Sequence, residues 1–273
     1  MADTSHPVAY EELLFEVEDH IATITLNAPE RMNTISGPML DGLSELLVKA
    51  DADPDIRVII LTGAGKAFCA GLNLQAATSG EGGVSAGSAG VTQASIDLRN
   101  TPPTILFNMD TPTICAINGG AAGYGMDTAM GCDIRVMSDK AKLAAAFTKR
   151  GVVPESGGTW FLPRLLGWEK AAQLIFTGRT LNAQESLDYG LVAQIVPHDD
   201  LMSEARRLAT EIASNAPLAV QSAKRMMRMG LSEPFNEHVH HVYLQLLPLL
   251  KSEDAREGMM AFLERRDPVF KGR

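Results

Sequence analysis

The sequence has no apolar run long enough to cross a lipid bilayer, although 45% of its 273 residues are hydrophobic. A spanning helix needs about 20 consecutive apolar residues, so we expect no membrane span and no membrane partner. Positive charge is also scarce, with 24 basic against 33 acidic residues and a net charge of −9. Binding to a phosphate backbone depends on clustered lysine and arginine, so we expect no nucleic-acid partner.

Cysteine is nearly absent. Cys69, Cys115 and Cys132 lie in apolar or glycine-rich surroundings without CxxC spacing. This pattern predicts buried, reduced thiols rather than disulfides or a zinc site. The amino-terminal residues include acidic side chains and no sustained apolar stretch, so no secretory signal or transit peptide is predicted. We therefore expect a cytoplasmic protein.

Strand and helix patterns alternate along the first half of the chain. Leu14–Val17 and Ile21–Leu26 are predicted to be paired strands, and a helix is predicted from near Ser36 until Asp53. The apolar run Val58–Leu61 is typical of a strand buried on both faces. Further predicted elements are strands at Thr113–Ile117, Ile134–Met137 and Lys142–Phe147, and a helix from about Gly123 to Met130. Strand, helix and strand in succession predict an α/β fold with right-handed crossovers.

Two later regions differ in composition from this pattern. Ala76–Ser95 is rich in glycine, serine and alanine, which predicts a flexible surface loop, with an ordered lid over a ligand as the alternative. From Gly167 onward the apolar spacing is helical. Methionines align with leucine and phenylalanine on these helices, which indicates an assembly surface rather than a cofactor site.

Two glycine-rich passages, Lys66–Leu74 and Ile117–Asp127, each follow a β-branched apolar run. Each pattern predicts a strand that enters a helix or turn, where the first backbone N–H groups have no intrahelical acceptor. Two such donors that converge on one point would form an oxyanion hole. The sequence therefore predicts a site that stabilises negative charge on a carbonyl oxygen.

Four segments carry a resemblance to a known family, and they are GAGKAFCAGLNL, INGGAAGYGMDTAMGCDIR, GVVPESGGTWFLPRLLG and ARRLATEIASNAPLAVQSAK. In order and spacing the chain resembles the enoyl-CoA hydratase/isomerase superfamily, also called the crotonase family, from about Phe15 to Ala223. The resemblance implies an α/β, crotonase-like spiral of repeated strand–strand–helix units over residues 1–205. It also implies a helical oligomerisation region over residues 206–273 that builds a homotrimer or a dimer of trimers. An acyl-CoA thioester of the kind used in fatty acid metabolism would be the substrate, with no cofactor beyond its coenzyme A.

The same resemblance assigns binding roles to particular residues. The two oxyanion amides would belong to Leu72 and Tyr124, where only the backbone N–H is required. Arg31 or Lys66 would approach the phosphates of coenzyme A; as the alternative, a solvated surface charge explains Arg31 equally well and Lys66 better. The other implied contacts with substrate are Met32, Gly123 and the backbone at Phe68, Ala70 and Gly71. Phe147, Tyr124 and the loop Ala76–Ser95 are candidates for shaping the acyl pocket.

Carboxylates decide which reaction such a site performs, since an α-proton next to a thioester needs a base. Hydratases of the family use two glutamates; by resemblance the first corresponds to Asp127 and the second to Phe147, which cannot transfer a proton. Glu155 resembles the acid of the family's double-bond isomerases, including peroxisomal-type enoyl-CoA isomerases and the ring-opening isomerase of phenylacetate breakdown. As alternatives, Glu155 only caps the following helix and Asp127 only bonds neighbouring backbone.

The leading hypothesis is an enoyl-CoA isomerase that uses Glu155 and the amides of Leu72 and Tyr124. The alternative within enzymes is an enoyl-CoA hydratase that uses Asp127 and Glu155. A third hypothesis is a non-catalytic acyl-CoA-binding or assembly subunit that keeps the fold.

Other chemistries lack their motifs in this sequence. The six histidines lie outside the glycine-rich passages, and His238 with His241 lacks the further ligands that a metal site needs, so no metal is implied. Gly63-Ala64-Gly65-Lys66 lacks the full phosphate-loop spacing, and no G-x-G-x-x-G follows a strand. Nucleotide-driven and dinucleotide chemistry are therefore disfavoured.

Overall fold

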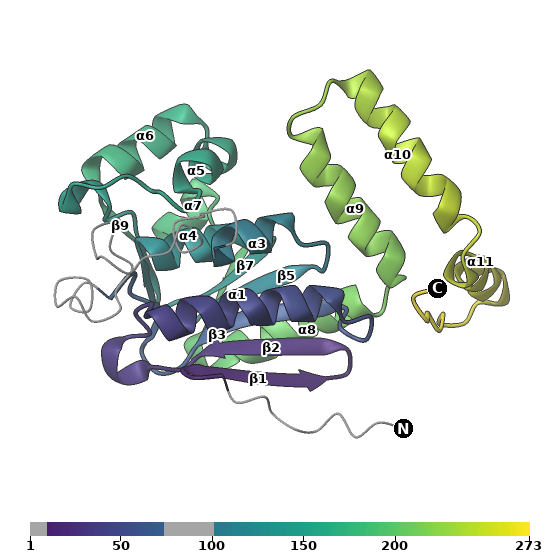
Figure 1. The fold of residues 1–273 in the computed structure, drawn as a ribbon, viewed down its shortest axis with the longest axis horizontal. Helices are drawn as coiled ribbons and strands as arrows, with labels where there is room; N and C mark the ends of the chain where they lie inside the picture. Colours follow the sequence, from purple (N-terminus) through teal and green to yellow (C-terminus); the bar gives the residue numbers. More distant parts are fainter. Residues whose placement is uncertain (1–9, 74–100) are drawn as a thin grey trace.

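A computed structural model describes residues 10–73 and 101–273 of the chain. Its strands are β1 (Leu13–Glu18), β2 (Ile21–Leu26), β3 (Val58–Gly63), β4 (Ala67–Cys69), β5 (Thr113–Ile117), β6 (Gly120–Ala122), β7 (Ile134–Ser138), β8 (Lys142–Ala144), β9 (Thr180–Asn182) and β10 (Gln194–Val196). They form a six-stranded sheet, in the order β1-β2-β3-β5-β7-β10, and a four-stranded sheet, in the order β4-β6-β8-β9 (Figure 1).

The helices cover both faces of the six-stranded sheet and continue beyond it. They are α1 (Gly37–Ala52), α3 (Pro102–Asn108), α4 (Tyr124–Gly131), α5 (Gly158–Leu166), α6 (Trp168–Thr177), α7 (Ala183–Tyr189), α8 (Leu201–Ala213), α9 (Pro217–Gly230), α10 (Phe235–Leu249) and α11 (Glu253–Glu264).

Three consecutive units build the two sheets. In each unit one strand joins the six-stranded sheet, the next strand joins the four-stranded sheet, and a helix follows. The units are β3, β4 and α3, then β5, β6 and α4, and then β7, β8 and α5. This arrangement confirms the predicted α/β spiral of repeated strand–strand–helix units.

The six-stranded sheet is buried on both faces. Along β3, Ile59 and Leu61 belong to the core that α1, α3 and α4 cover, whereas Val58 and Ile60 pack with α8. Successive side chains of a strand point to opposite faces, so burial on both faces explains the unbroken apolar run that the sequence shows here.

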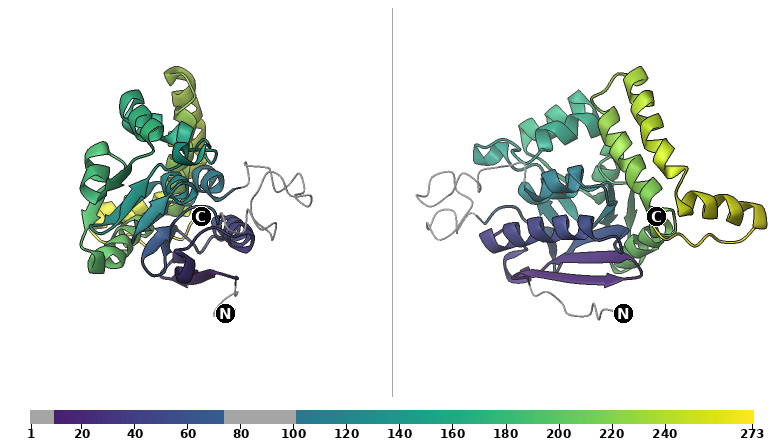
Figure 2. Two further views of the ribbon diagram at one scale, coloured as in Figure 1. Left: turned by 90° about the vertical axis from the view of Figure 1, so that its left-hand side faces the viewer. Right: turned by 45° about the vertical axis from the view of Figure 1, so that its right-hand side comes forward.

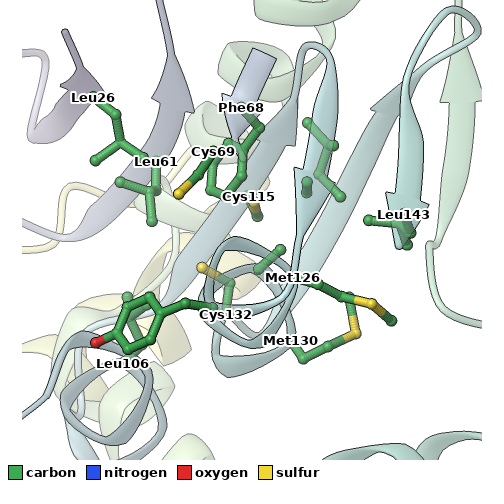
Figure 3. Close-up of a cluster of buried hydrophobic side chains, with 14 of the residues drawn as sticks. Leu26, Leu61, Phe68, Cys69, Leu106, Cys115, Met126, Met130, Cys132 and Leu143 are labelled. Carbon is green, nitrogen blue, oxygen red and sulfur yellow. The ribbon is translucent and has the colours of Figure 1, made fainter. Parts of the chain in front are cut away.

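The three cysteines lie in the larger core. Cys69, Cys115 and Cys132 are free and buried, as predicted, in the same apolar cluster as Phe68 and Met126 (Figure 3). Burial raises the pKa of the Cys69 thiol to about 12. The thiol therefore stays protonated at neutral pH and contributes to packing.

Two predicted boundaries need correction. The strand predicted for Lys142–Phe147 ends at Ala144, because the backbone of Phe147 is helical and its carbonyl accepts from the N–H of Arg150 at 2.8 Å. The predicted division between residues 205 and 206 falls inside α8, which packs on the sheet through Ala205 and Ala209. α8 therefore packs with the sheet as one helix, and the place where a core and a helical region divide stays a prediction.

The last three helices stand at one end of the molecule, and α11 projects away from the sheets (Figures 1 and 2). The predicted loop Ala76–Ser95 lies outside the described residues. Across residues 10–73 and 101–273, no helix combines the length and apolar character that crossing a membrane requires.

Candidate functional site

The two predicted glycine-rich turns meet at one edge of the four-stranded sheet. β4 and β6 are parallel neighbours, so their carboxyl ends lie at the same edge. Gly71 follows β4 with a φ of 103°, and a Cβ on it would lie 2.9 Å from the carbonyl oxygen of Ala122. The same Cβ position is 3.9 Å from the backbone nitrogen of Tyr124. Glycine at this position therefore permits the close approach of two turns that are far apart in the chain.

The backbone amide of Leu72 has no acceptor among the described residues. Ile35 donates its N–H to the carbonyl of Gly71 at 2.8 Å, and Asn73 donates to the carbonyl of Ile35 at 3.0 Å. In this parallel bridge the groups of Leu72 point away from Ile35. The Leu72 N–H thus stays available to a ligand.

The amide of Tyr124 is available for a different reason. Tyr124 is the first residue of α4, whose first backbone bond runs from the N–H of Asp127 to the carbonyl of Gly123 at 3.0 Å. The first N–H groups of a helix have no intrahelical partner, and the described part of the chain offers Tyr124 no other acceptor. Two amides without an acceptor among the described residues therefore stand on adjacent turns, as an oxyanion hole requires.

Close packing fixes the start of α4 against its neighbours. A Cβ on Gly125 would lie 2.2 Å from the carbonyl oxygen of Cys69, so only glycine fits there. On the same turn, the Phe147 ring lies 3.9 Å from the Cβ position of Gly123 and is 4% exposed. An apolar ring, and no acid, borders the Gly123–Tyr124 turn at this point.

Asp127 is fully buried one turn into α4, and neither carboxylate oxygen accepts a hydrogen bond from a described residue. It faces the start of α5, where a Cβ on Gly158 would lie 2.3 Å from its Oδ1. Burial raises the pKa of Asp127 to about 7, and the charge of Glu155 adds to this effect. The nearby backbone N–H groups of Gly158 and Ser156 offset only part of it. Asp127 can therefore hold or release a proton near neutral pH.

This raised pKa predicts a pH-dependent stability. The folded chain binds the proton of Asp127 more tightly than the unfolded chain does, so this proton stabilises the folded chain. The stabilisation is fully present below the usual pKa of 3.8 and is lost as pH rises through about 7. Asp127→Asn removes this dependence. The difference in unfolding free energy between the variant and the wild type is therefore expected to depend on pH. From about pH 5 to about pH 8 it shifts in favour of the variant by at most about 2.5 kcal/mol. Urea denaturation at both pH values measures the unfolding free energies, and Asp41→Asn at an exposed position is the control. If the difference between Asp127→Asn and the wild type is the same at both pH values, the raised pKa of Asp127 is contradicted.

Glu155 stands beside Asp127 in the turn that precedes α5. Its side chain is half-buried and forms no hydrogen bond or ion pair with the described residues. Its negative charge raises the pKa of both Asp127 and the buried hydroxyl of Tyr124, so the three groups are close in space. The structure thus gathers both predicted acids near the turn that carries the Tyr124 amide.

Residues predicted to contact coenzyme A differ in environment. Arg31 forms ion pairs with Glu12 at 2.5 Å and Glu30 at 3.3 Å, so its charge is already compensated. Met32 is 57% exposed, and its carbonyl accepts from the N–H of Ala70 at 3.0 Å.

Phe68 differs from the other predicted contacts. Its side chain is fully buried in the core, so only its backbone remains for substrate. Lys66 is exposed.

Two buried asparagines that the sequence interpretation missed hold this region in place. The side-chain amide of Asn33 donates to the carbonyls of Ala64 at 2.9 Å and Ala67 at 2.8 Å. Asn118 accepts from the N–H of Gly63 at 3.2 Å and also donates to the carbonyl of Ala67, at 3.2 Å. Asn118 directly follows a buried strand, a position that could have signalled its role. Together they fix the turn that leads into β4.

An aromatic cluster beside Glu155 was also not predicted. Phe107 of α3 packs edge-on against Trp160 and Phe161 of α5, with ring centroids 4.9 Å and 5.6 Å away. The Phe161 ring in turn lies against Gly157, two residues after Glu155. Within the described ranges no group of three or more histidine, cysteine or acidic side chains is arranged to hold a metal ion.

Comparison with known proteins identifies the family. A family model described as enoyl-CoA hydratase/isomerase matches residues 16–273. The chain belongs to this family. Members of the enoyl-CoA hydratase/isomerase family are enzymes that act on acyl-CoA thioesters, which is consistent with two unpaired amides beside buried and half-buried acids.

Relatives and solved structures agree with the family assignment. The chain is 37% identical to a putative enoyl-CoA hydratase/isomerase of Bacillus subtilis strain 168, covering 96% of this chain and 99% of that protein. It is also 37% identical to (E)-benzylidenesuccinyl-CoA hydratase of Thauera aromatica, covering 94% and 98%. The crystal structure of an enoyl-CoA hydratase from Bacillus anthracis matches with a TM-score of 0.89 at 33% identity, covering 96% and 100%. These matches support the crotonase-like fold and an acyl-CoA enzyme.

Proposed function

We propose that this enzyme is an enoyl-CoA isomerase that moves a carbon–carbon double bond from the 3,4 to the 2,3 position. The amides of Leu72 and Tyr124 donate to the thioester oxygen, and Glu155 takes a proton from C2. The electron pair of that C–H bond moves into the conjugated system, and its negative charge rests on the thioester oxygen between the two amides. Glu155 then returns the proton to C4, so atoms and charge balance without a cofactor beyond coenzyme A.

One observation carries this proposal: Glu155 is a half-buried carboxylate beside the Tyr124 turn, and it has no partner among the described residues. A base that only moves a proton between two carbons needs no second acid to activate water. Phe147 supports the proposal, because its buried apolar ring borders the turn where the resemblance puts the second acid of hydratases.

Hydration of a 2-enoyl-CoA by Asp127 and Glu155 is the second candidate. Two observations favour it. One of the relatives is named as a hydratase. The pKa of Asp127 is raised to about 7 beside a second carboxylate, and two acids in unequal environments can divide the acid and base roles. The family's enzymatic character argues against a non-catalytic subunit.

Two substrates separate the candidates. The enzyme is incubated with a 3-enoyl-CoA and, separately, with a 2-enoyl-CoA, while the absorbance of the conjugated thioester is followed. A gain of absorbance with the 3-enoyl-CoA is expected from an isomerase, whereas a loss with the 2-enoyl-CoA indicates water addition. Absence of the gain contradicts the isomerase proposal, and absence of both changes contradicts both candidates.

We further propose that the enzyme assembles as a homotrimer or a dimer of trimers through its last helices. α10 has no buried residue in the single chain, and large apolar side chains of α10 and α11 are exposed. They include Phe235, Tyr243, Leu244, Leu247, Met259, Phe262 and Leu263. Contiguous exposed apolar surface is typical of subunit contacts.

A single charge tests this assembly surface. Leu244→Glu is expected to dissociate the assembly, because a buried unpaired carboxylate costs several kcal/mol. Sedimentation velocity measures the mass. Val48→Glu is the control, since Val48 is also an exposed apolar residue, 55% exposed, but lies on α1. A wild-type monomer, or equal dissociation of both variants, would overturn the proposal.

A further inference from the structure

We propose that Arg228 and Lys224 of α9 are positioning residues for the acid–base site and act through α3. The inference rests on the proposed function of Glu155 and the Tyr124 amide. Both cations are largely buried, with side-chain exposures of 19% for Arg228 and 10% for Lys224. They come from the first helix of the carboxyl-terminal group and contact a segment far away in the sequence.

Both side chains donate to backbone carbonyls at the end of α3. The acceptors and distances are Phe107 (3.2 Å) and Met109 (3.0 Å) for Arg228, and Leu106 (3.4 Å) and Thr111 (2.9 Å) for Lys224. The last carbonyls of a helix have no intrahelical donor, and cations are favourable there. A helix of 7 residues is unstable alone, so these contacts contribute to holding α3 in place.

α3 contacts both helices beside the candidate site, α4 and α5. Toward α4, a Cβ on Gly131 would lie 2.8 Å from the carbonyl oxygen of Pro103. Toward α5, the Phe107 ring packs on Trp160 and Phe161 as described above. α3 therefore contacts both the helix of the oxyanion amide and the helix that follows Glu155.

The contacts continue as far as Gly157, two residues after Glu155. A Cβ on Gly157 would lie 2.5 Å from the Phe161 ring, so this ring packs directly against the turn that holds Glu155. Movement of the Phe107 carbonyl and ring would shift Phe161 and this turn together. A misplacement of about 1 Å between a base and its substrate can lower the rate on the order of 100-fold. Arg228 thus influences catalysis without touching substrate.

Arg225 provides a matched comparison on the same helix. Arg225 and Arg228 both pair with the Asp110 carboxylate, Arg228 at 3.1 Å. Arg225 also donates to the Gln245 side chain at 3.0 Å, but among the described residues it donates to no carbonyl of α3. Arg225→Ala therefore removes an ion pair with Asp110, as Arg228→Ala does, but it leaves the hydrogen bonds to α3 in place.

The test compares Arg228→Ala, Arg228→Lys and Arg225→Ala. We expect Arg228→Ala to lower kcat at least about tenfold with KM changed less than about twofold, because the chemical step and not coenzyme A binding is affected. Arg228→Lys retains one cation and is expected to recover part of kcat. Arg225→Ala is expected to stay within about twofold of the wild type.

A second readout does not depend on activity. In a Trp168→Phe background Trp160 is the sole tryptophan of the sequence. In this background Arg228→Ala is expected to red-shift the fluorescence emission of Trp160 and to increase its quenching by iodide. Arg225→Ala is expected to change neither. Lys224→Met, which keeps the aliphatic stem, serves in both assays if Arg228→Ala does not fold.

These readouts separate two failures. If the wild type turns over neither enoyl-CoA, the proposed function fails, and Trp160 fluorescence still decides whether α9 controls the packing of α3 on α5. If Glu155→Gln abolishes activity but Arg228→Ala matches Arg225→Ala in kcat and fluorescence, the positioning role is overturned. Equal losses of kcat in both arginine variants would also overturn it.

Discussion

Replacing Glu155 by glutamine is expected to lower kcat for the double-bond shift by a factor on the order of 10² to 10⁴, the usual contribution of a positioned general base. Glutamine keeps the volume and the polarity of glutamate but cannot accept the C2 proton at neutral pH. The backbone amides of Leu72 and Tyr124 are unchanged by the substitution. KM for the acyl-CoA is therefore expected to stay close to that of the wild type. Steady-state kinetics with a 3-enoyl-CoA measure both constants.

Two further variants make this result specific. Glu169→Gln removes an exposed acid from the first turn of α6 and is expected to leave kcat unchanged. Asp127→Asn separates the two candidate reactions. If Glu155 alone moves the proton, this variant is expected to change kcat only slightly. If both acids take part in hydration, replacing Asp127 and replacing Glu155 are expected to lower kcat by similar factors. A Glu155→Gln enzyme that keeps wild-type kcat would exclude Glu155 as the base.

Local sequence patterns were enough to predict most of the longer helices and strands. Ile21–Leu26 and Thr113–Ile117 are observed with the predicted bounds, and Ser36 caps α1 by accepting from the N–H of Met39 at 3.2 Å. Such elements follow from periodicity and capping, which act over a few neighbouring residues. The short strands of the second sheet were harder to predict. The 3-residue strand β9 pairs with β8 and has little pattern of its own.

The environments within the site depend on contacts between distant segments. The sequence identified Asp127 and Glu155 as acids, but the burial of Asp127 follows from the packing of α5 onto α4 through Gly158. The same holds for Phe107, which meets Trp160 only after α3 is in place. A pKa is set by such surroundings, so residue type alone could not show that Asp127 titrates near neutral pH.

Gly125→Ala is expected to have a large effect at the other half of the site. Its Cβ would lie 2.2 Å from the carbonyl oxygen and 2.7 Å from the Cβ of Cys69, and neither belongs to a flexible side-chain end. The start of α4 must therefore move away from β4, and it carries the Tyr124 amide with it. Loss of one oxyanion donor costs about 2.7–4 kcal/mol, so kcat is expected to fall on the order of 10² to 10³-fold.

Gly120→Ala separates this effect from a general cost of adding a methyl group. A Cβ on Gly120 meets no atom within 4 Å, and its φ lies outside the range that favours glycine. Circular dichroism and thermal unfolding show whether Gly125→Ala keeps its fold, since overpacking by one methyl typically costs 1–3 kcal/mol. A folded Gly125→Ala enzyme with the kcat of Gly120→Ala would mean that the Tyr124 amide does not contact the reacting oxygen. Glu155 would then lack the charge stabilisation that makes C2 acidic enough for a carboxylate base, and both proposed reactions would lose their common step.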